Sequence, residues 1–346
     1  MRVLVTGGSG FLGSHIIDAC LAQGDDVVAL VRRSSDLSYL KTLPRVELRA
    51  AELTDAASLA AVTREVEVVY HAAARVTDYG SRARFIAANV RGTEHLLRAA
   101  QRTGAARFVF ISTPSVVADG THQVNIDESY PIPRRFQNLY SATKAEAEAL
   151  VLASNTPDFI TCALRPRAVW GPRDRQGFMP KIVAKLLAGR LRKLSRGEPV
   201  LASLCYCENA ALACVQAARS PKVGGRAYFI ADDEVVDVWP FIDEIAAMFG
   251  APAVRGRVSP AVLRVVVALV EALWAIPALG HHRSPPVSRY SVSLLTCSAT
   301  FDTAAARRDF GYEPRVSQAE GFRRLRTWID AIGGVAAFVQ HVKDGQ

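Results

Sequence analysis

The first thirteen residues constrain the fold of this chain more than any other stretch. Residues 2–6 are apolar and rich in β-branched side chains, which predicts a strand buried on both faces. Gly7, Gly10 and Gly13 follow at GxxGxxG spacing, and an apolar helical pattern begins at Phe11. Glycines there allow a sharp turn, close approach of backbone N–H groups to a phosphate, and tight packing of helix on strand. Because the helix N-terminus adds a partial positive charge, we expect this loop to bind a nucleotide pyrophosphate.

Strands and helices alternate through the first third of the chain. Further strands are expected at 26–31, 46–49, 66–71 and 107–112, with helical patterns between them. This alternation predicts an α/β fold, a Rossmann-type doubly wound parallel sheet, followed by a smaller, mostly helical C-terminal substrate lobe. We expect a dinucleotide-binding domain over 1–165 and a substrate-binding lobe over 166–346, interleaved with the first. Residues 116–138 are expected to form a long loop, and residues 333–346 to fray.

The composition narrows the function classes. Of 346 residues, 50% are hydrophobic, so a large core is expected rather than disorder. The net charge of +9 comes without a Lys/Arg run interleaved with aromatics, which favours an anionic cofactor and substrate over nucleic acid; a merely basic soluble surface is the alternative. Six cysteines without a CxxC pair, and a strand beginning at residue 2, indicate a cytoplasmic protein with reduced thiols. No metal site is predicted, since adjacent histidines such as His281 and His282 rarely share one metal.

Two arginines follow the second expected strand. Arg32 and Arg33 stand where the adenosine ribose of a dinucleotide lies, and no carboxylate occurs before Asp36. An acidic residue there favours NAD, whereas arginine pairs with the 2′-phosphate of NADP. The sequence therefore favours NADP(H), with NAD(H) as the alternative.

Tyr140 and Lys144 form the candidate catalytic pair. They lie four residues apart in a strongly helix-forming stretch, so they share one helix face. A lysine ammonium one turn away favours the tyrosinate and is expected to lower a tyrosine pKa that is ordinarily near 10. A hydroxyl from the end of strand 107–112, on Ser112 or Thr113, can hold the reacting oxygen beside the tyrosine.

Five motifs resemble the extended short-chain dehydrogenase/reductase family. They are TGGSGFLG at 6–13, VVYHAAA at 68–74, NVRGT at 89–93, YSATK at 140–144 and LRPRAVWGP at 164–172. Residues 108–117 and 140–151 look most like the 3β-hydroxysteroid dehydrogenase branch, with its sterol-4-carboxylate 3-dehydrogenases and 2-alkyl-3-oxoalkanoate reductases. The resemblance implies an enzyme acting on a secondary alcohol or ketone of a hydrophobic, often carboxylated, molecule.

The resemblance also assigns roles to residues. Tyr140 would protonate the substrate oxygen, Lys144 would bind the nicotinamide ribose, and the family's catalytic serine falls on Thr113, with Ser112 as the alternative. The residues expected to bind the cofactor are Gly7, Gly8, Ser9, Gly10, Phe11, Leu12, Gly13, Arg32, Arg33, Glu52, Leu53, His71, Ala72, Ala73, Asn89, Tyr140, Lys144 and Pro166.

Two departures from the family pattern stand out. Ala51-Glu52-Leu53 replaces the usual Gly-Asp-Leu, which puts the adenine contact in doubt. Glu208-Asn209 replaces an aspartate-asparagine pair and follows Cys205-Tyr206-Cys207, so the pocket chemistry there is expected to differ. Cys207 is expected to pack rather than react, because no histidine lies near it in the sequence.

Three functions were compared. The favoured one is an NAD(P)-dependent oxidoreductase that interconverts a ketone and a secondary alcohol on a hydrophobic substrate of 3-oxo acid or 3-ketosteroid type. A nucleotide-sugar epimerase or dehydratase is less favoured, because Arg32-Arg33 does not suit NAD and Pro114-Ser115 lacks the carboxylate of a dehydratase. A non-catalytic NADP sensor is disfavoured because the Tyr140–Lys144 pair is intact.

Residues 261–279 are the most apolar stretch of the chain, but Arg264, Glu271 and Pro277 interrupt it too often for a membrane span. The favoured interpretation is a helix that covers a hydrophobic substrate pocket. A contact with a partner, as in a homodimer, and a peripheral membrane contact are the alternatives.

Overall fold

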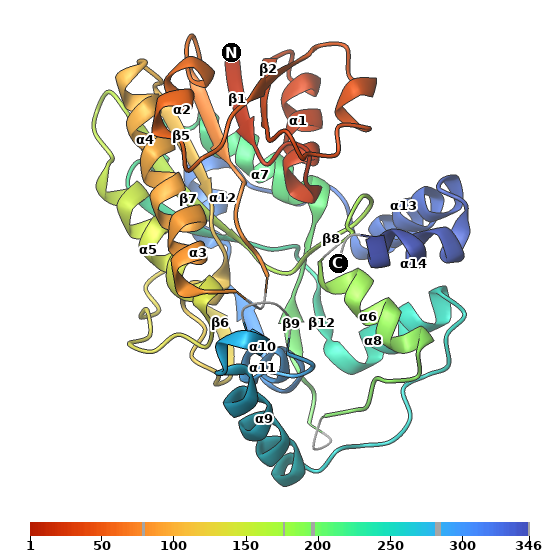
Figure 1. The fold of residues 1–346 in the computed structure, drawn as a ribbon. Helices are drawn as coiled ribbons and strands as arrows, with labels where there is room; N and C mark the ends of the chain where they lie inside the picture. Colours follow the sequence, from red (N-terminus) through yellow and green to blue (C-terminus); the bar gives the residue numbers. More distant parts are fainter. Residues whose placement is uncertain (78–79, 176, 195–197, 281–284, 345–346) are drawn as a thin grey trace.

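A seven-stranded parallel sheet forms the centre of the protein (Figure 1). The computed structural model describes residues 1–77, 80–175, 177–194, 198–280 and 285–344. The strand order is β11-β7-β5-β4-β1-β2-β3, and every neighbouring pair is parallel. The strands are β1 (Arg2–Thr6), β2 (Asp26–Val31), β3 (Val46–Ala50), β4 (Val68–His71), β5 (Arg107–Ile111), β7 (Ile160–Pro166) and β11 (Arg226–Ile230). This sheet confirms the predicted Rossmann-type fold.

Helices cover both faces of this sheet, which explains why its strands are apolar almost throughout. Val3 and Val5 point toward α1 (Phe11–Ala22) and α7 (Cys207–Arg219), while Leu4 points to the opposite face. That opposite face carries α2 (Ala56–Val62), α4 (Gly92–Arg102) and α5 (Leu139–Ala153). Between β4 and β5, α3 (Arg82–Phe85) runs through a wider π-helical stretch at Ile86–Arg91 into α4.

A second, four-stranded sheet joins distant parts of the chain. Its order is β12-β9-β13-β6, from β12 (Val235–Asp237), β9 (Leu201–Ser203), β13 (Ala299–Phe301) and β6 (Gln123–Ile126). The prediction of a structureless loop over 116–138 is therefore wrong, because β6 pairs with β13. Conversely, β11 comes from the second half of the chain and extends the first sheet. A division of the chain at residue 165 stays a prediction.

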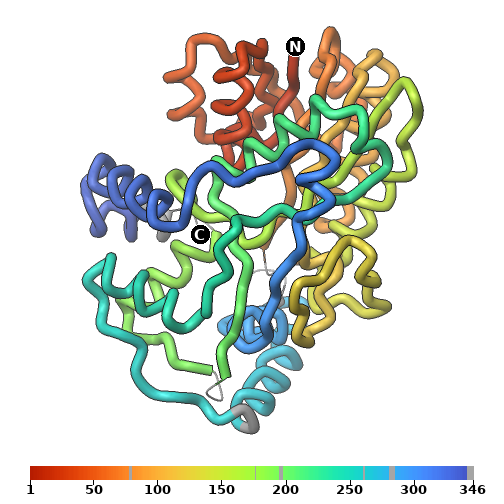
Figure 2. The backbone as a smooth tube through the Cα atoms, turned by 180° about the vertical axis from the view of Figure 1, so that it is seen from behind, coloured from red at the N-terminus to blue at the C-terminus, as the bar shows by residue number. Residues whose placement is uncertain are grey.

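Four further helices surround a second core built on Trp170 and Tyr206, from the short strands β8 (Val169–Trp170) and β10 (Cys205–Tyr206). They are α6 (Phe178–Leu187), α8 (Val238–Met248), α13 (Gln318–Ala331) and α14 (Gly334–Asp344), with α12 (Ala304–Phe310) behind the first sheet. Figure 2 shows α13 and α14 lying together at one side of the molecule.

The expectation that residues 333–346 fray is wrong for residues 334–344, which form α14. Phe338 is 1% exposed, and its ring lies 5.5 Å from the ring of Phe249 and 6.1 Å from that of Trp328. The tail is ordered because its apolar side chains complete the second core.

Because Phe338 closes this core, Phe338→Ala is expected to lower the free energy of unfolding by about 3–5 kcal/mol. Ala336→Ser on the exposed side of the same helix is the control, and it should change stability by less than about 0.5 kcal/mol. Urea denaturation of the two variants measures both values. Equal stability of the two variants would contradict a docked C-terminal helix.

Candidate functional site

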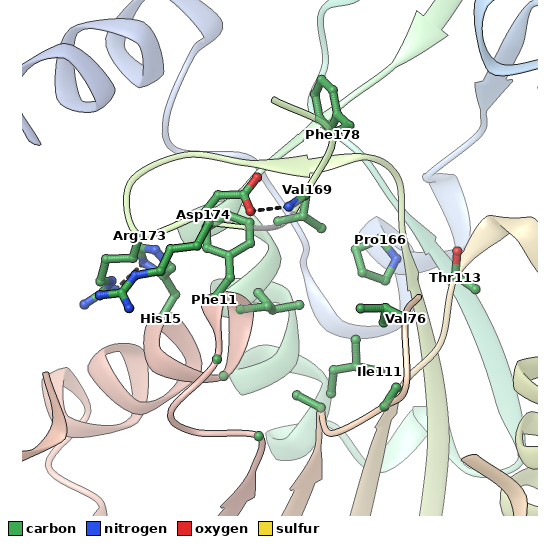
Figure 3. Close-up of a pocket in the computed structure, with 18 of the residues that line it drawn as sticks. Phe11, His15, Val76, Ile111, Thr113, Pro166, Val169, Arg173, Asp174 and Phe178 are labelled. Carbon is green, nitrogen blue, oxygen red and sulfur yellow. Dashed lines mark hydrogen bonds between the residues drawn. The ribbon is translucent and has the colours of Figure 1, made fainter. Parts of the chain in front are cut away.

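A cleft of about 2500 Å³ opens at the carboxyl ends of β1, β4, β5 and β7. This is the edge at which parallel α/β sheets bind their ligands. Figure 3 shows Phe11 from the start of α1, Ile111 and Thr113 from the end of β5, and Pro166 from the end of β7 around the same space. Most of the predicted site residues therefore meet in one cavity, although they come from segments far apart in the sequence.

The glycine loop has the geometry of a phosphate cradle. Gly7 has a φ of 69°, and a Cβ on it would lie 2.9 Å from the backbone nitrogen of Ala73. A Cβ on Gly13 would overlap the carbonyl oxygen of Gly7, so the helix and the turn touch. Gly10 begins α1 without a side-chain cap, which leaves N–H groups of the first turn free for an anion. The loop therefore fits the pyrophosphate of a dinucleotide.

The arginines after β2 lie near this loop. Arg32 lines the cleft, whereas Arg33 is exposed and does not line it. Within the described residues, neither guanidinium has an ion pair. Asp36, the nearest carboxylate, is held by the backbone N–H of Ser38 at 2.9 Å and by Arg175 at 2.8 Å, which lower its pKa to about 2. Glu52 and Leu53 also line the cleft, as predicted for the adenine side.

His71 and Asn89 do not line the cleft, in contrast to the expected cofactor contact. The imidazole of His71 lies between the hydroxyls of Thr6, 2.7 Å from Nδ1, and Thr93, 2.9 Å from Nε2. Burial lowers the pKa of this histidine to about 3, so it stays neutral. The amide of Asn89 accepts a hydrogen bond from the backbone N–H of Arg75 at 2.7 Å and donates one to its carbonyl at 3.1 Å. The hydrogen bonds of His71 and Asn89 therefore stabilise the end of β4 and the turn that follows it.

Tyr140 and Lys144 line the cleft from the first turns of α5. Asn138 fixes the start of this helix by accepting a hydrogen bond from the backbone N–H of Ser141 at 2.7 Å. The Lys144 ammonium donates to the carbonyl of Ile111 at 2.6 Å and lies 3.7 Å from the ring centroid of Phe110. Helix α5 is therefore tied directly to the end of β5.

Burial dominates the electrostatics of this pair. It lowers the pKa of Lys144 to about 7, and it raises the pKa of Tyr140 above its usual value. The expected lowering of the tyrosine pKa by the lysine is thus not found in the protein alone. The physical reason is that desolvation disfavours the charged form of both groups.

The two candidate hydroxyls have different surroundings. A hydrogen bond with Thr113 partly offsets the effect of burial on the pKa of Tyr140. Thr113 Oγ1 also accepts from the backbone N–H of Ser115 at 3.2 Å. Ser112 Oγ is buried, and it has no hydrogen-bond partner among the described residues. The contact with Tyr140 favours Thr113 as the hydroxyl that holds the reacting oxygen.

The sequence analysis missed part of the cleft wall. Arg167 and Tyr290 also line it, and Leu294 and Phe178, the latter labelled in Figure 3, add apolar surface. The position of Arg167, directly after Pro166 at a strand end, was a usable signal. Tyr290 had none, because α11 (Arg289–Thr296) reaches the cleft only through the tertiary fold.

Glu208 and Asn209 of the second lobe line the cleft and are also bound within the protein. The Asn209 amide donates to Asp232 at 2.7 Å and to the carbonyl of Val316 at 2.8 Å, while Glu208 pairs with Arg324. Cys207 is buried, and burial raises the pKa of its thiol, which suits the expected packing role. No cluster of His, Cys, Asp or Glu that could hold a metal occurs in the described ranges, and His281 and His282 lie outside them.

Helix α9 (Pro260–Trp274) does not line the cleft, so the favoured interpretation of 261–279 as a pocket cover is wrong. It projects from the body of the molecule (Figure 1). Five of its apolar side chains are at least 41% exposed: Val262, Val265, Val266, Leu269 and Leu273. None of the helices in the described residues has the length and apolar character needed to cross a bilayer.

Sequence comparison identifies relatives of this chain. A family model described as the 3-beta hydroxysteroid dehydrogenase/isomerase family matches residues 4–257. A 2-alkyl-3-oxoalkanoate reductase of Stenotrophomonas maltophilia is 36% identical over 333 residues, covering 94% of this chain and 98% of the relative. A 3 beta-hydroxysteroid dehydrogenase/Delta 5-->4-isomerase of Mycobacterium tuberculosis is 34% identical over 328 residues, covering 90% of this chain and 86% of the relative.

A third relative is named as a ketoreductase of a dihydroquinoline oxide. A 4-hydroxy-2-methyl-3-oxo-4-farnesyl-3,4-dihydroquinoline-1-oxide ketoreductase of Stigmatella aurantiaca is 36% identical over 327 residues, covering 94% of this chain and 96% of the relative. Among solved structures, a dTDP-glucose 4,6-dehydratase from Streptomyces venezuelae superposes with a TM-score of 0.76 at 23% identity, covering 97% of this chain and 100% of the other. At that identity the likeness concerns the fold.

The depressed pKa of Lys144 predicts a pH dependence of stability. An unfolded lysine titrates near 10.4, so between pH 7 and 10 the unfolded chain binds more protons than the folded one. Wild type should therefore gain about 1–3 kcal/mol of stability from pH 7 to 9 relative to Lys144→Met, and the difference should level off below pH 7. Denaturant titration at several pH values measures this slope. Lys222→Met, which removes an exposed lysine, should follow wild type; a wild-type slope in Lys144→Met would contradict the shift.

Proposed function

Because the chain belongs to the 3-beta hydroxysteroid dehydrogenase/isomerase family, we propose that it reduces the ketone of a hydrophobic 3-oxo substrate with NADPH. It is an oxidoreductase of the extended short-chain dehydrogenase/reductase type. The observation that carries the proposal is the meeting of Tyr140, Lys144 and Thr113 with the glycine loop in one cleft. Phe178 and Leu294 in the same cleft suit an apolar substrate body.

In this proposal each side chain has one task. A nicotinamide bound in the cleft would supply the hydride that reaches the carbonyl carbon. Tyr140 gives its hydroxyl proton to the carbonyl oxygen, so that a secondary alcohol forms. Thr113 donates a hydrogen bond that orients this oxygen toward the tyrosine. Lys144, anchored at the carbonyl of Ile111, binds the ribose and favours the tyrosinate that remains after the proton transfer.

A nicotinamide dinucleotide is the cofactor, and the preference for NADP(H) over NAD(H) is our proposal. Arg32 in the cleft wall and Arg33 beside it support this preference, because neither is paired with a carboxylate of the described residues. Asp36, the first carboxylate after the two arginines in the sequence, is already engaged by Arg175.

We also propose that α9 is a contact surface in a cytoplasmic protein. Soluble monomers rarely expose so contiguous an apolar face. A second copy of the chain or the surface of an anionic membrane could cover it, the latter helped by the net charge of +9. Analytical ultracentrifugation would detect a dimer, and flotation with anionic liposomes would detect membrane binding.

Replacing Tyr140 by Phe removes the proton donor without emptying the space of the ring. Tyr140→Phe is expected to lower kcat about 10²- to 10⁴-fold with any ketone that wild type reduces. NADPH consumption against 3-oxo acids, 3-ketosteroids and nucleotide sugars measures both the substrate class and this loss. Tyr130→Phe, which removes a hydroxyl bonded to Asp119 on the surface, is the control. Full activity of Tyr140→Phe would exclude the mechanism.

The cofactor preference has its own test. Replacing Arg32 and Arg33 together by Ala is expected to weaken NADPH binding about 10- to 100-fold, because charge-assisted hydrogen bonds to the 2′-phosphate are lost. NADH binding should change little, and Arg45→Ala on the exposed surface should leave both unchanged. Fluorescence titration with each cofactor gives the dissociation constants. Equal losses for NADPH and NADH would refute the preference.

A further inference from the structure

Arg167 in the cleft wall has no carboxylate partner among the described residues. Arg167 follows β7 and lines the cleft together with Ser112 and Tyr140. Its backbone N–H donates to the carbonyl of Ile230 at 3.0 Å, but its guanidinium takes part in no hydrogen bond or ion pair within the described part of the chain. The Nε atom is fully buried and unpaired. Pro166, labelled in Figure 3, is the last residue of β7, and Arg167 follows it directly in the sequence.

A neighbouring arginine, Arg165, is buried, whereas Arg167 is half-buried with only its Nε fully enclosed. Arg165 is bound through two hydrogen bonds by Glu148, at 3.0 Å from Nε and 2.5 Å from a terminal nitrogen. Buried charges in proteins are normally paired in this way, because an unpaired one is costly. Within the residues that the structure describes, Arg165 thus has a carboxylate partner and Arg167 has none.

The surroundings of Arg167 offer hydrogen-bond donors rather than negative charge. A side pocket of about 30 Å³ next to the cleft is lined by Arg167, Gln137 and Tyr290, and none of its lining residues is Asp or Glu. The Gln137 amide nitrogen is also buried without a partner, and the Ser293 hydroxyl, which donates to Oε1 at 3.1 Å, fixes the orientation of that amide. Two donors, the guanidinium of Arg167 and the amide of Gln137, therefore line one small space that shares Arg167 and Tyr290 with the cleft wall.

We propose that Arg167 binds the carboxylate of a 3-oxo acid whose ketone lies at Tyr140, and that it selects such acids over neutral ketones. This inference rests on the proposed ketone reduction. A planar guanidinium matches a carboxylate with two parallel hydrogen bonds, and a lysine cannot replace that geometry. In a 3-oxo acid the carboxylate is two bonds from the ketone carbon, so both groups fit within one wall of the cleft.

The proposed role of Arg167 predicts different activity toward the compounds for which the relatives are named. A 2-alkyl-3-oxoalkanoate carries the required carboxylate, whereas a 3-ketosteroid presents no anion to Arg167. A site that has buried donors for one substrate group discriminates against analogues that lack it, because the donors would then stay unpaired. Phe178 and Leu294 suit the alkyl chains of such an acid.

The test compares a freshly prepared acid, 2-hexyl-3-oxodecanoate, with its methyl ester. Wild type is expected to show a kcat/KM about 10- to 100-fold higher for the acid. Arg167→Met should lose about this factor with the acid, mainly through KM, and change less than about threefold with the ester. Arg167→Lys should recover part of the loss, and Arg134→Met on the exposed surface should behave as wild type.

Two results would overturn the inference: equal kcat/KM of wild type for acid and ester, or equal losses of Arg167→Met with both. Calorimetric titration of NADP⁺-saturated protein with 2-hexyldecanoate, which cannot be reduced, tests the same site without turnover. Wild type should bind it at least about tenfold more tightly than Arg167→Met does. If wild type reduces no ketone, the proposed function fails while this titration still decides the carboxylate site.

Discussion

The contact between Gly13 and the carbonyl of Gly7 is the constraint on which the rest of the site depends. Because no Cβ stands between them, α1 begins against the end of β1, and its first turn faces the cleft. The same close approach brings Gly7 against the backbone of Ala73 after β4. Helix α7, from the second half of the chain, packs on α1 and so supports the helix that follows the glycine loop.

Local patterns predicted the parts of the site that depend on neighbouring residues. The strand-glycine-helix order of residues 2–17, and the four-residue spacing of Tyr140 and Lys144, are readable because a turn and a helix face are local structures. The strand at 123–126 was missed because its partner is β13, far along the chain. His71 was misassigned because a polar residue at a strand end can point into the sheet as well as into the cleft. Arg167 and Tyr290 meet only in the folded protein.

Burial gives the cleft its chemical character. Desolvation lowers the pKa of Lys144 and of Arg167 and raises that of Tyr140, so each of these groups is held with its charged form disfavoured. The described residues near Arg167 supply no carboxylate to offset this. A phosphate or carboxylate bound there would therefore favour the charged forms of Lys144 and Arg167.

Each sheet contains strands from distant parts of the chain, and this affects how the chain folds during its synthesis. Asn125 in β6 meets Thr300, which is 175 residues further on, so the edge of β6 has no partner until almost the whole chain has left the ribosome. In the same way β7 stays an edge strand until β11 emerges. Open edges invite pairing with other chains. The nascent protein therefore passes through an interval in which the first sheet is nearly complete while the edges of β6 and β7 are still open to wrong pairing.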